Sequence, residues 1–177
     1  MNDLFRLEYF YLAFRIWTII SLCLGLTGIV IFLYQRLKKE SRKKFIGAIL
    51  FGQMWLSVLI FMLINNTIQW KAKSELLHKI NLSTSSIQLC DHELNEQLTP
   101  GYKQLLLNIG EIPRHHSSAT YCGYIKLNSG NETIKLRFER DNNIKTEYWV
   151  YWDKYTVTKD NAIGYLRTDK LDEMNCR

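Results

Sequence analysis

The chain has 177 residues, of which 47% are hydrophobic, 23% charged and 13% aromatic, and this composition excludes a wholly disordered protein. Its length allows one domain, or one domain with an appendage. The formal net charge of +6 belongs almost entirely to residues 36–44, because residues 71–177 hold 15 basic and 14 acidic side chains. A nearly neutral domain disfavours nucleic acid as a partner.

Residues 1–70 contain two uncharged apolar stretches that are long enough to span a membrane. The first covers about residues 16–35, and the second covers about residues 45–66. A helix of 20 residues rises about 30 Å, which matches the hydrocarbon core of a bilayer, so we expect a transmembrane helical hairpin. The alternatives are buried helices of a soluble protein or a cleaved signal peptide. The small size of the chain argues against the first, and the acidic residues Asp3 and Glu8 near its start argue against the second.

Between the two stretches lies a short basic loop, residues 36–44, with a charge of +5. Lys and Arg near the ends of spans are retained on the cytoplasmic side. We therefore expect this loop inside, and both termini outside, in the periplasm if the cell is a Gram-negative bacterium. The residues that determine this topology are Arg36, Lys38, Lys39, Arg42, Lys43 and Lys44.

Small and polar residues within the spans are candidates for helix–helix contact. Glycines let membrane helices approach closely, although glycine is also common in such helices without a packing role. The candidates are Gly25, Gly28, Gly47 and Gly52, with Thr27, Gln53 and Ser57 as hydrogen-bonding residues. Neither span contains an ionisable residue, which disfavours a pump or transporter.

Residues 71–100 are polar and begin as a helical continuation of the second span, so we interpret them as a stalk or linker. Residues 101–177 alternate apolar and polar side chains in short runs, which is typical of antiparallel strands with one covered face. The fold class predicted is α+β, a two-helix transmembrane hairpin followed by a small antiparallel β-rich extracytoplasmic domain. The expected strands are 102–112, 120–128, 132–140, 144–152, 155–159 and 163–168.

Cys90, Cys122 and Cys176 follow the spans. A β domain of this size often needs extra stabilisation, and an oxidising compartment would let two of the three form a disulfide. The sequence does not say which two, and it leaves open that all three are buried thiols.

No catalytic, cofactor-binding or metal-binding motif is recognisable in the sequence. Cys90, His92, His115, His116 and Cys122 are metal-ligand types, but they lack the paired spacing of a structural zinc site. The adjacent His115 and His116 are instead a candidate pH-responsive element, because an imidazole titrates near about pH 6.5. The alternative is a solvated loop in which both histidines have no special role.

The predicted strand at 144–152 is strongly aromatic. Its alternation places Trp149 and Tyr151 on the face opposite Tyr148, Val150 and Trp152. Either both faces are covered, or Trp149 and Tyr151 form an open surface for a partner protein.

Residues 118–168 contain Cys-Gly before a strand, then IKLRF, YWVYW and YTVTK, and this layout resembles the ToxS, FidL and Myf/Psa kind of inner-membrane proteins. These are partners of membrane-bound transcription activators. The resemblance implies a non-enzymatic protein whose periplasmic domain binds and stabilises or modulates such an activator and reports envelope conditions such as acidity, in the control of virulence or fimbrial genes. The alternative is a membrane-anchored immunity protein that neutralises a secreted or contact-delivered toxin.

Overall fold

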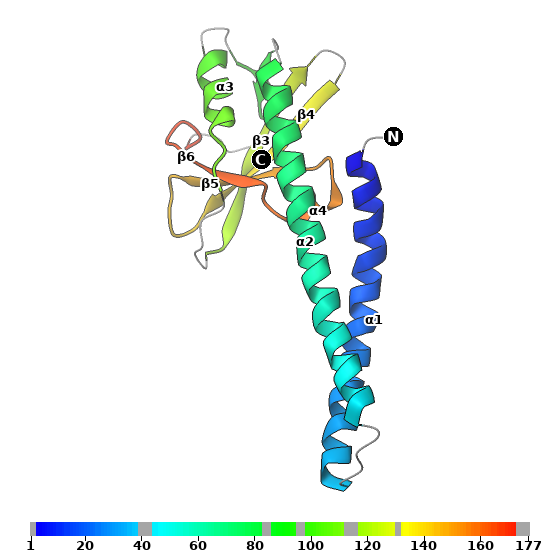
Figure 1. Cartoon of the computed structure of the whole chain (residues 1–177). Helices are drawn as coiled ribbons and strands as arrows, with labels where there is room; N and C mark the ends of the chain where they lie inside the picture. Colours follow the sequence, from blue (N-terminus) through cyan, green and yellow to red (C-terminus); the bar gives the residue numbers. More distant parts are fainter. Residues whose placement is uncertain are drawn as a thin grey trace. The chain divides into compact units, whose positions relative to one another are not determined.

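The computed structural model describes residues 3–38, 44–82, 86–94, 98–111, 117–129 and 132–172. Its fold is α+β: two long apolar helices form a hairpin, and a six-stranded antiparallel sheet follows (Figure 1). The chain divides into two compact units, Met1–Ile68 and Gln69–Arg177. The second long helix contributes residues to both units.

The first unit contains α1 (Asp3–Lys38) and most of α2 (Lys44–Leu82). Both prolines of the chain, Pro100 and Pro113, come later, so no proline interrupts either helix. Each helix is long and apolar enough to cross a membrane, as the two apolar stretches predicted. In their most apolar windows only 17% and 11% of the residues are buried, which is unlike the core helix of a soluble protein.

Glycines allow α1 and α2 to pack closely. A Cβ at Gly25 would lie 2.6 Å from the Cβ of Met54, and one at Gly28 would lie 2.8 Å from the Cβ of Leu50. These separations are too short for carbon atoms, so both positions require glycine at this helix spacing. Gly52 has nothing within 4 Å of the place that a Cβ would occupy. It therefore takes no part in the contact.

Two buried serines also join the helices. The hydroxyl of Ser21 donates a hydrogen bond to Oγ of Ser57 at 3.0 Å and approaches the carbonyl oxygen of Gln53 at 3.5 Å. Thr27, also a candidate for a bond across the pair, donates instead to the carbonyl oxygen of Cys23 in its own helix. The hairpin is thus held by close backbone approach and by one buried serine pair.

The strands of the second unit are β1 (Ile87–Leu89), β2 (His92–Glu93), β3 (Ala119–Ser129), β4 (Glu132–Asp141), β5 (Glu147–Trp152) and β6 (Gly164–Arg167). They form one sheet with the order β2-β1-β3-β4-β5-β6, and all neighbouring strands are antiparallel. The last four confirm the strands predicted at 120–128, 132–140, 144–152 and 163–168, although β5 begins three residues later than predicted.

The strand predicted at 102–112 is wrong, because most of this segment lies in the helix α3 (Thr99–Leu107). Pro100 occupies one of the first two helical positions, where its missing N–H is not needed and its fixed φ favours a helix. After the helix, the N–H of Gly110 donates to the carbonyl oxygen of Tyr165 at 2.9 Å. This single bridge places residue 110 beside the β6 edge of the sheet.

The strand predicted at 155–159 is also wrong, since the short helix α4 (Thr156–Asp160) occupies this position. The hydroxyl of Thr158 donates to the carbonyl oxygens of Trp152 and Tyr155, at 2.5 and 3.2 Å. These bonds tie the helix to the end of β5. Consecutive burial of Val157 and Thr158 does not fit the period of two that a half-covered strand requires.

Residues 71–100, interpreted from the sequence as a stalk, hold much of the regular structure that completes the second unit. They supply the last turns of α2, then β1 and β2, and the start of α3. Ala72, Leu76 and Ile80 have no exposed surface. Their spacing of four residues places them on one side of α2, which crosses in front of the sheet in Figure 1. The sheet contributes Ile125, Leu136, Phe138 and Val150 to the fully buried core.

Candidate functional site

Apolar side chains are exposed on all sides of the hairpin. Phe10, for example, is 64% exposed. An exposed apolar surface of this extent is unfavourable in water and marks a surface that lipid or protein covers. Other large exposed residues on it are Ile16, Trp17, Ile19, Val30, Leu33, Phe45, Ile46, Ile49, Trp55, Leu56, Leu59, Met62 and Leu63.

The predicted topology determinants lie at the loop end of the hairpin. Arg36 is exposed near the end of α1, which closes at Lys38, and α2 begins at Lys44. Lys39, Arg42 and Lys43 lie outside the described residues. The six basic residues therefore belong to the two helix ends and the segment that joins them.

Trp149 and Tyr151 belong to a larger aromatic surface on one face of the sheet. Cross-strand pairing runs from Tyr121 to Glu139, from Glu139 to Trp149, and from Trp149 to Tyr165. A second row runs from Tyr124 to Arg137 and on to Tyr151. Residues paired directly across antiparallel strands share a face. We call this surface the aromatic face, and its aromatic residues are Tyr121, Tyr124, Trp149, Tyr151 and Tyr165.

Basic side chains from the same strands lie over several rings of the aromatic face. The guanidinium of Arg137 is 4.1 Å from the ring centre of Tyr151, and Nζ of Lys135 is 4.4 Å from that of Tyr124. Tyr151 is only 7% exposed, and burial, together with the nearby Glu139 carboxylate, raises its pKa to about 12. Tyr121 is 50% exposed. The accessible part of the face is therefore centred on the β3 side rather than on Tyr151.

The sequence interpretation named only Trp149 and Tyr151 on this surface. Tyr121, Tyr124 and Tyr165 join it because of the order and register of β3, β4, β5 and β6. A correct strand order would have been the signal, since alternation within each strand was already visible in the sequence.

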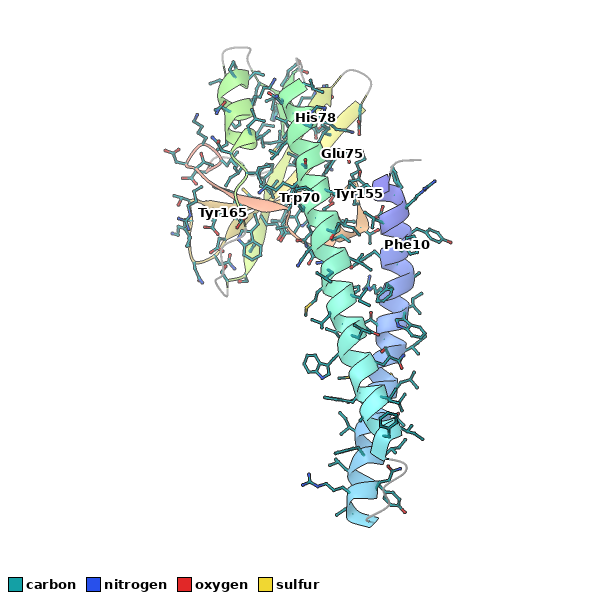
Figure 2. The ribbon with its side chains drawn as sticks, in the orientation of Figure 1. Phe10, Trp70, Glu75, His78, Tyr155 and Tyr165 are labelled. Atoms are coloured by element: carbon teal, nitrogen blue, oxygen red, sulfur yellow. The ribbon has the colours of Figure 1, made fainter. Side chains whose placement is uncertain are left out.

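An ionic network fastens the end of α2 to the sheet. The carboxylate of Glu75 accepts hydrogen bonds from Nζ of Lys154 at 2.7 Å and from the hydroxyl of Tyr155 at 2.5 Å (Figure 2). Lys79, one turn later on α2, lies 3.3 Å from Glu75 and pairs with Glu132 at the start of β4. We call these five residues the helix–sheet junction. Its members come from α2, β4 and the segment before α4.

Contacts within the helix–sheet junction keep Glu75, Glu132 and Lys79 charged around neutral pH. Burial alone would raise the pKa of Glu75, but hydrogen bonds from Lys154, Tyr155 and Lys79 lower it below its ordinary value. The hydrogen bond from Lys79 lowers the pKa of Glu132. Burial would lower the pKa of Lys79, yet its hydrogen bonds raise it. Such shifts suit a structural clamp and not a proton-transfer group, whose pKa lies near the working pH.

The cysteines differ in whether they are thiols in the structure. Among the described residues, Cys23 and Cys122 are thiols outside any disulfide, and Cys90 is not one of them. Burial raises the pKa of the Cys122 thiol, which keeps it protonated at neutral pH. The structure forms no disulfide at Cys122, and which of the three cysteines pair stays a prediction. No disulfide joins two residues of the described part of the chain, and Cys176 lies outside it.

His115 and His116 also lie outside the described residues, so the pH-responsive element stays a prediction. His92 lies in the exposed two-residue strand β2. Within the ranges that the structure describes, no group of three or more His, Cys, Asp or Glu residues is placed to hold a metal ion.

A second polar cluster, which the sequence did not indicate, surrounds the turn between β1 and β2. Cys90 and Asp91 have φ angles of 52° and 68°, a conformation that favours Asn or Gly in a two-residue hairpin loop. The carboxylate of Asp91 accepts hydrogen bonds from the hydroxyl of Tyr124 and from Nζ of Lys126. These bonds from β3 lower the pKa of Asp91 and hold the turn in place.

No family model, curated protein or solved structure matches this chain.

Proposed function

We propose that this chain is a non-enzymatic protein of a bacterial inner membrane, with two spans and both termini in the periplasm. Its sheet unit binds a membrane-bound regulator there and stabilises or modulates it. The observation that carries this proposal is the continuity of α2. The same helix supplies exposed apolar residues of the hairpin, such as Trp55, and the residues Ala72 and Leu76, which are buried in the core of the second unit. The sheet is thereby attached directly to a membrane helix.

The orientation rests on charge. Basic residues at the loop end of the hairpin are retained in the cytoplasm, which leaves the sheet unit on the opposite side. Trp70 supports this arrangement: its ring is 71% exposed, and it closes the uncharged stretch of α2, just before Lys71. Tryptophan at such a position is typical of the interface between membrane and water.

The choice of a regulator as partner rests on the resemblance of residues 118–168 to partners of membrane-bound transcription activators. The aromatic face supports a binding role, because half-exposed aromatic rings beside basic side chains are enriched at protein interfaces. Tyr121 is its most exposed ring.

The proposal is tested by photocrosslinking the full-length protein in its own membrane. A photoreactive amino acid replaces Tyr121 on the aromatic face, and a matched variant carries it at Lys170, an exposed position outside the sheet strands. We expect the Tyr121 variant alone to capture a membrane protein with a DNA-binding domain. Capture of a secreted toxin would assign the chain to immunity instead, and identical capture from both positions would contradict the aromatic face as the binding surface.

A further inference from the structure

Two lysines of the aromatic face lie directly opposite each other. Lys126 of β3 is the cross-strand partner of Lys135 of β4, and we call these two residues the lysine pair. Nζ of Lys126 lies 5.2 Å and Nζ of Lys135 lies 4.4 Å from the ring centre of Tyr124, so both ammonium groups gather over one ring. Like charges directly opposite each other destabilise a sheet, and the fold alone therefore does not favour this arrangement.

One carboxylate beside the lysine pair compensates only part of its charge. Asp91 pairs with Lys126 at 2.5 Å and also accepts the hydrogen bond from Tyr124. Lys135 is exposed and makes no ion pair with any residue that the structure describes. Two lysines beside one carboxylate leave one positive charge uncompensated.

The acidic residues on the same face do not supply the missing negative charge. Glu139 and Glu147 are paired with arginines of this face. Glu93 of β2 shares the face by register, but three strand spacings, about 14 Å, separate it from Lys135. The part of the aromatic face on β3 and β4 is therefore locally positive, which is complementary to a carboxylate of a partner.

An exposed ring follows the lysine pair along β3. Tyr121 is 50% exposed, and no other large apolar side chain on the described strands is exposed. Tyr124 separates it from Lys126 on this face, so Tyr121 and the lysine pair lie about 13 Å apart along the strand. A small inorganic anion contacts only the lysines. An extended polypeptide presents side chains on one side about every 6.6 Å, so its residues i and i+4 match this distance.

We propose that the aromatic face binds an extended acidic segment of the partner protein, with a carboxylate at the lysine pair and an apolar side chain on Tyr121. The inference rests on the proposed function, because it names the part of the regulator that this face recognises. A bound carboxylate removes the repulsion between the two ammonium groups, which makes the lysine pair favourable in the complex. Nucleic acid, which also carries anions and rings, is disfavoured by the near-neutral charge of residues 71–177.

The test is photocrosslinking of the full-length protein in its own membrane, with the photoreactive amino acid at Thr133. This exposed position lies on the same face of β4, two residues before Lys135, and leaves Tyr121 and the lysine pair intact. We expect the captured peptide of the regulator, sequenced by mass spectrometry, to carry Asp or Glu within about four residues of the crosslink. A captured peptide without a carboxylate, or capture of a second copy of this chain, would overturn the inference.

Charge variants separate binding from folding. Lys135→Glu should lower capture at Thr133 about tenfold, because it places a like charge against the acidic segment. It should not lower the midpoint of thermal unfolding, since an opposite-charge pair replaces a like-charge pair. Lys145→Glu makes the same change at an exposed position between β4 and β5 and should leave capture unchanged. Exchange of the partner's acidic residue for Lys should restore capture by Lys135→Glu.

Failure of the proposed function gives a different result. If neither the Thr133 variant nor the Tyr121 variant captures a membrane protein, the sheet unit binds no regulator and both proposals are refuted. If Lys135→Glu retains the capture of a regulator, the acidic segment alone is excluded. An equal loss of capture with Lys145→Glu would exclude it too, because the effect would then come from overall charge.

Discussion

Glu75 is the residue on which the helix–sheet junction most depends. Its carboxylate accepts hydrogen bonds from Lys154 and Tyr155 and lies within 3.3 Å of Lys79. The side chain keeps only 19% of its surface exposed, so water replaces these donors poorly when they are lost. Hydrogen bonds to a charged and partly buried group contribute more than those at an open surface.

We expect Glu75→Gln to lower the free energy of unfolding of the full-length protein by about 1–2 kcal/mol, because Lys154 and Tyr155 lose a charged acceptor. Thermal unfolding in detergent measures the change. Glu93→Gln, on the exposed strand β2, is the control and should shift the midpoint little. Equal shifts of the unfolding midpoint in both variants would show that the helix–sheet junction contributes no more to stability than an exposed surface position does.

The pKa shifts of the helix–sheet junction predict its pH dependence. A carboxylate whose pKa is lowered in the folded state contributes stability above its unfolded pKa, and that stability is lost as pH falls. For Glu75 and Glu132 the loss begins near the ordinary value of 4.5 and continues below it. The raised pKa of Lys79 contributes stability that is present below 10.5 and is lost above it.

Stability from the helix–sheet junction should therefore stay constant between about pH 6 and 9. Unfolding measured across this range in the natural chain and in Glu75→Gln should give parallel curves.

His115 and His116 are two of the four histidines of the chain and form its candidate pH-responsive element. If they are the sensor, the double variant His115→Gln, His116→Gln should abolish an acid response near about pH 6.5, whereas His78 and His92, which it keeps, should not sustain one. An unchanged acid response in that variant would exclude the two histidines as the sensor.

The cysteines give a prediction by elimination. Cys122 forms no disulfide in the structure, so the remaining pair outside the spans is Cys90 and Cys176. We expect Cys90→Ser and Cys176→Ser to slow migration on a non-reducing gel equally. Each variant removes the same disulfide, which closes a loop and keeps the denatured chain compact. Cys122→Ser should migrate like the natural chain. A shift caused by Cys122→Ser would refute this pairing.

Among whole elements, α1 and α2 depend on glycine for their contact. We expect Gly25→Leu to separate the helices, since even its Cβ would lie 2.6 Å from two atoms of Met54. Gly52→Leu is the matched control, because open space surrounds that position and leucine favours a helix more than glycine does. Disulfide crosslinking between cysteines placed at Ser21 and Ser57 measures helix proximity. The crosslink should fail only with Gly25→Leu.

The elements show where sequence patterns suffice. Alternation correctly predicted β3, β4 and β6, because alternate residues of these strands are buried against the core. β5 was predicted as well, although both of its faces are buried and only Trp149 is partly exposed. The same method failed at residues 102–112 and 155–159, where Pro100 starts a helix and Thr158 ties a short helix to β5. The hairpin of β1 and β2 was missed because its turn is Cys90-Asp91 and not a favoured Asn-Gly pair.

For the whole molecule, the decisive question is the orientation of the hairpin. We expect alkaline phosphatase fused after Arg177 to be active, because the C-terminus is outside, and a fusion at Glu40 to be silent. A cytoplasmic reporter at the same two positions should give the reverse pattern. An active phosphatase at Glu40 with a silent one after Arg177 would contradict the topology and remove the periplasmic partner.

The apolar composition of residues 16–35 and 45–66 determined the two long helices, because a helix satisfies its own backbone hydrogen bonds and needs no distant partner. The alternation of residues 119–168 likewise determined most strands. Only the tertiary structure decided that the end of α2 forms part of the sheet core, that five aromatic residues share one face, and that Gly25 and Gly28 lie where the two long helices meet. Those features depend on strand register and on helix separation, which are set by contacts between residues far apart in the chain.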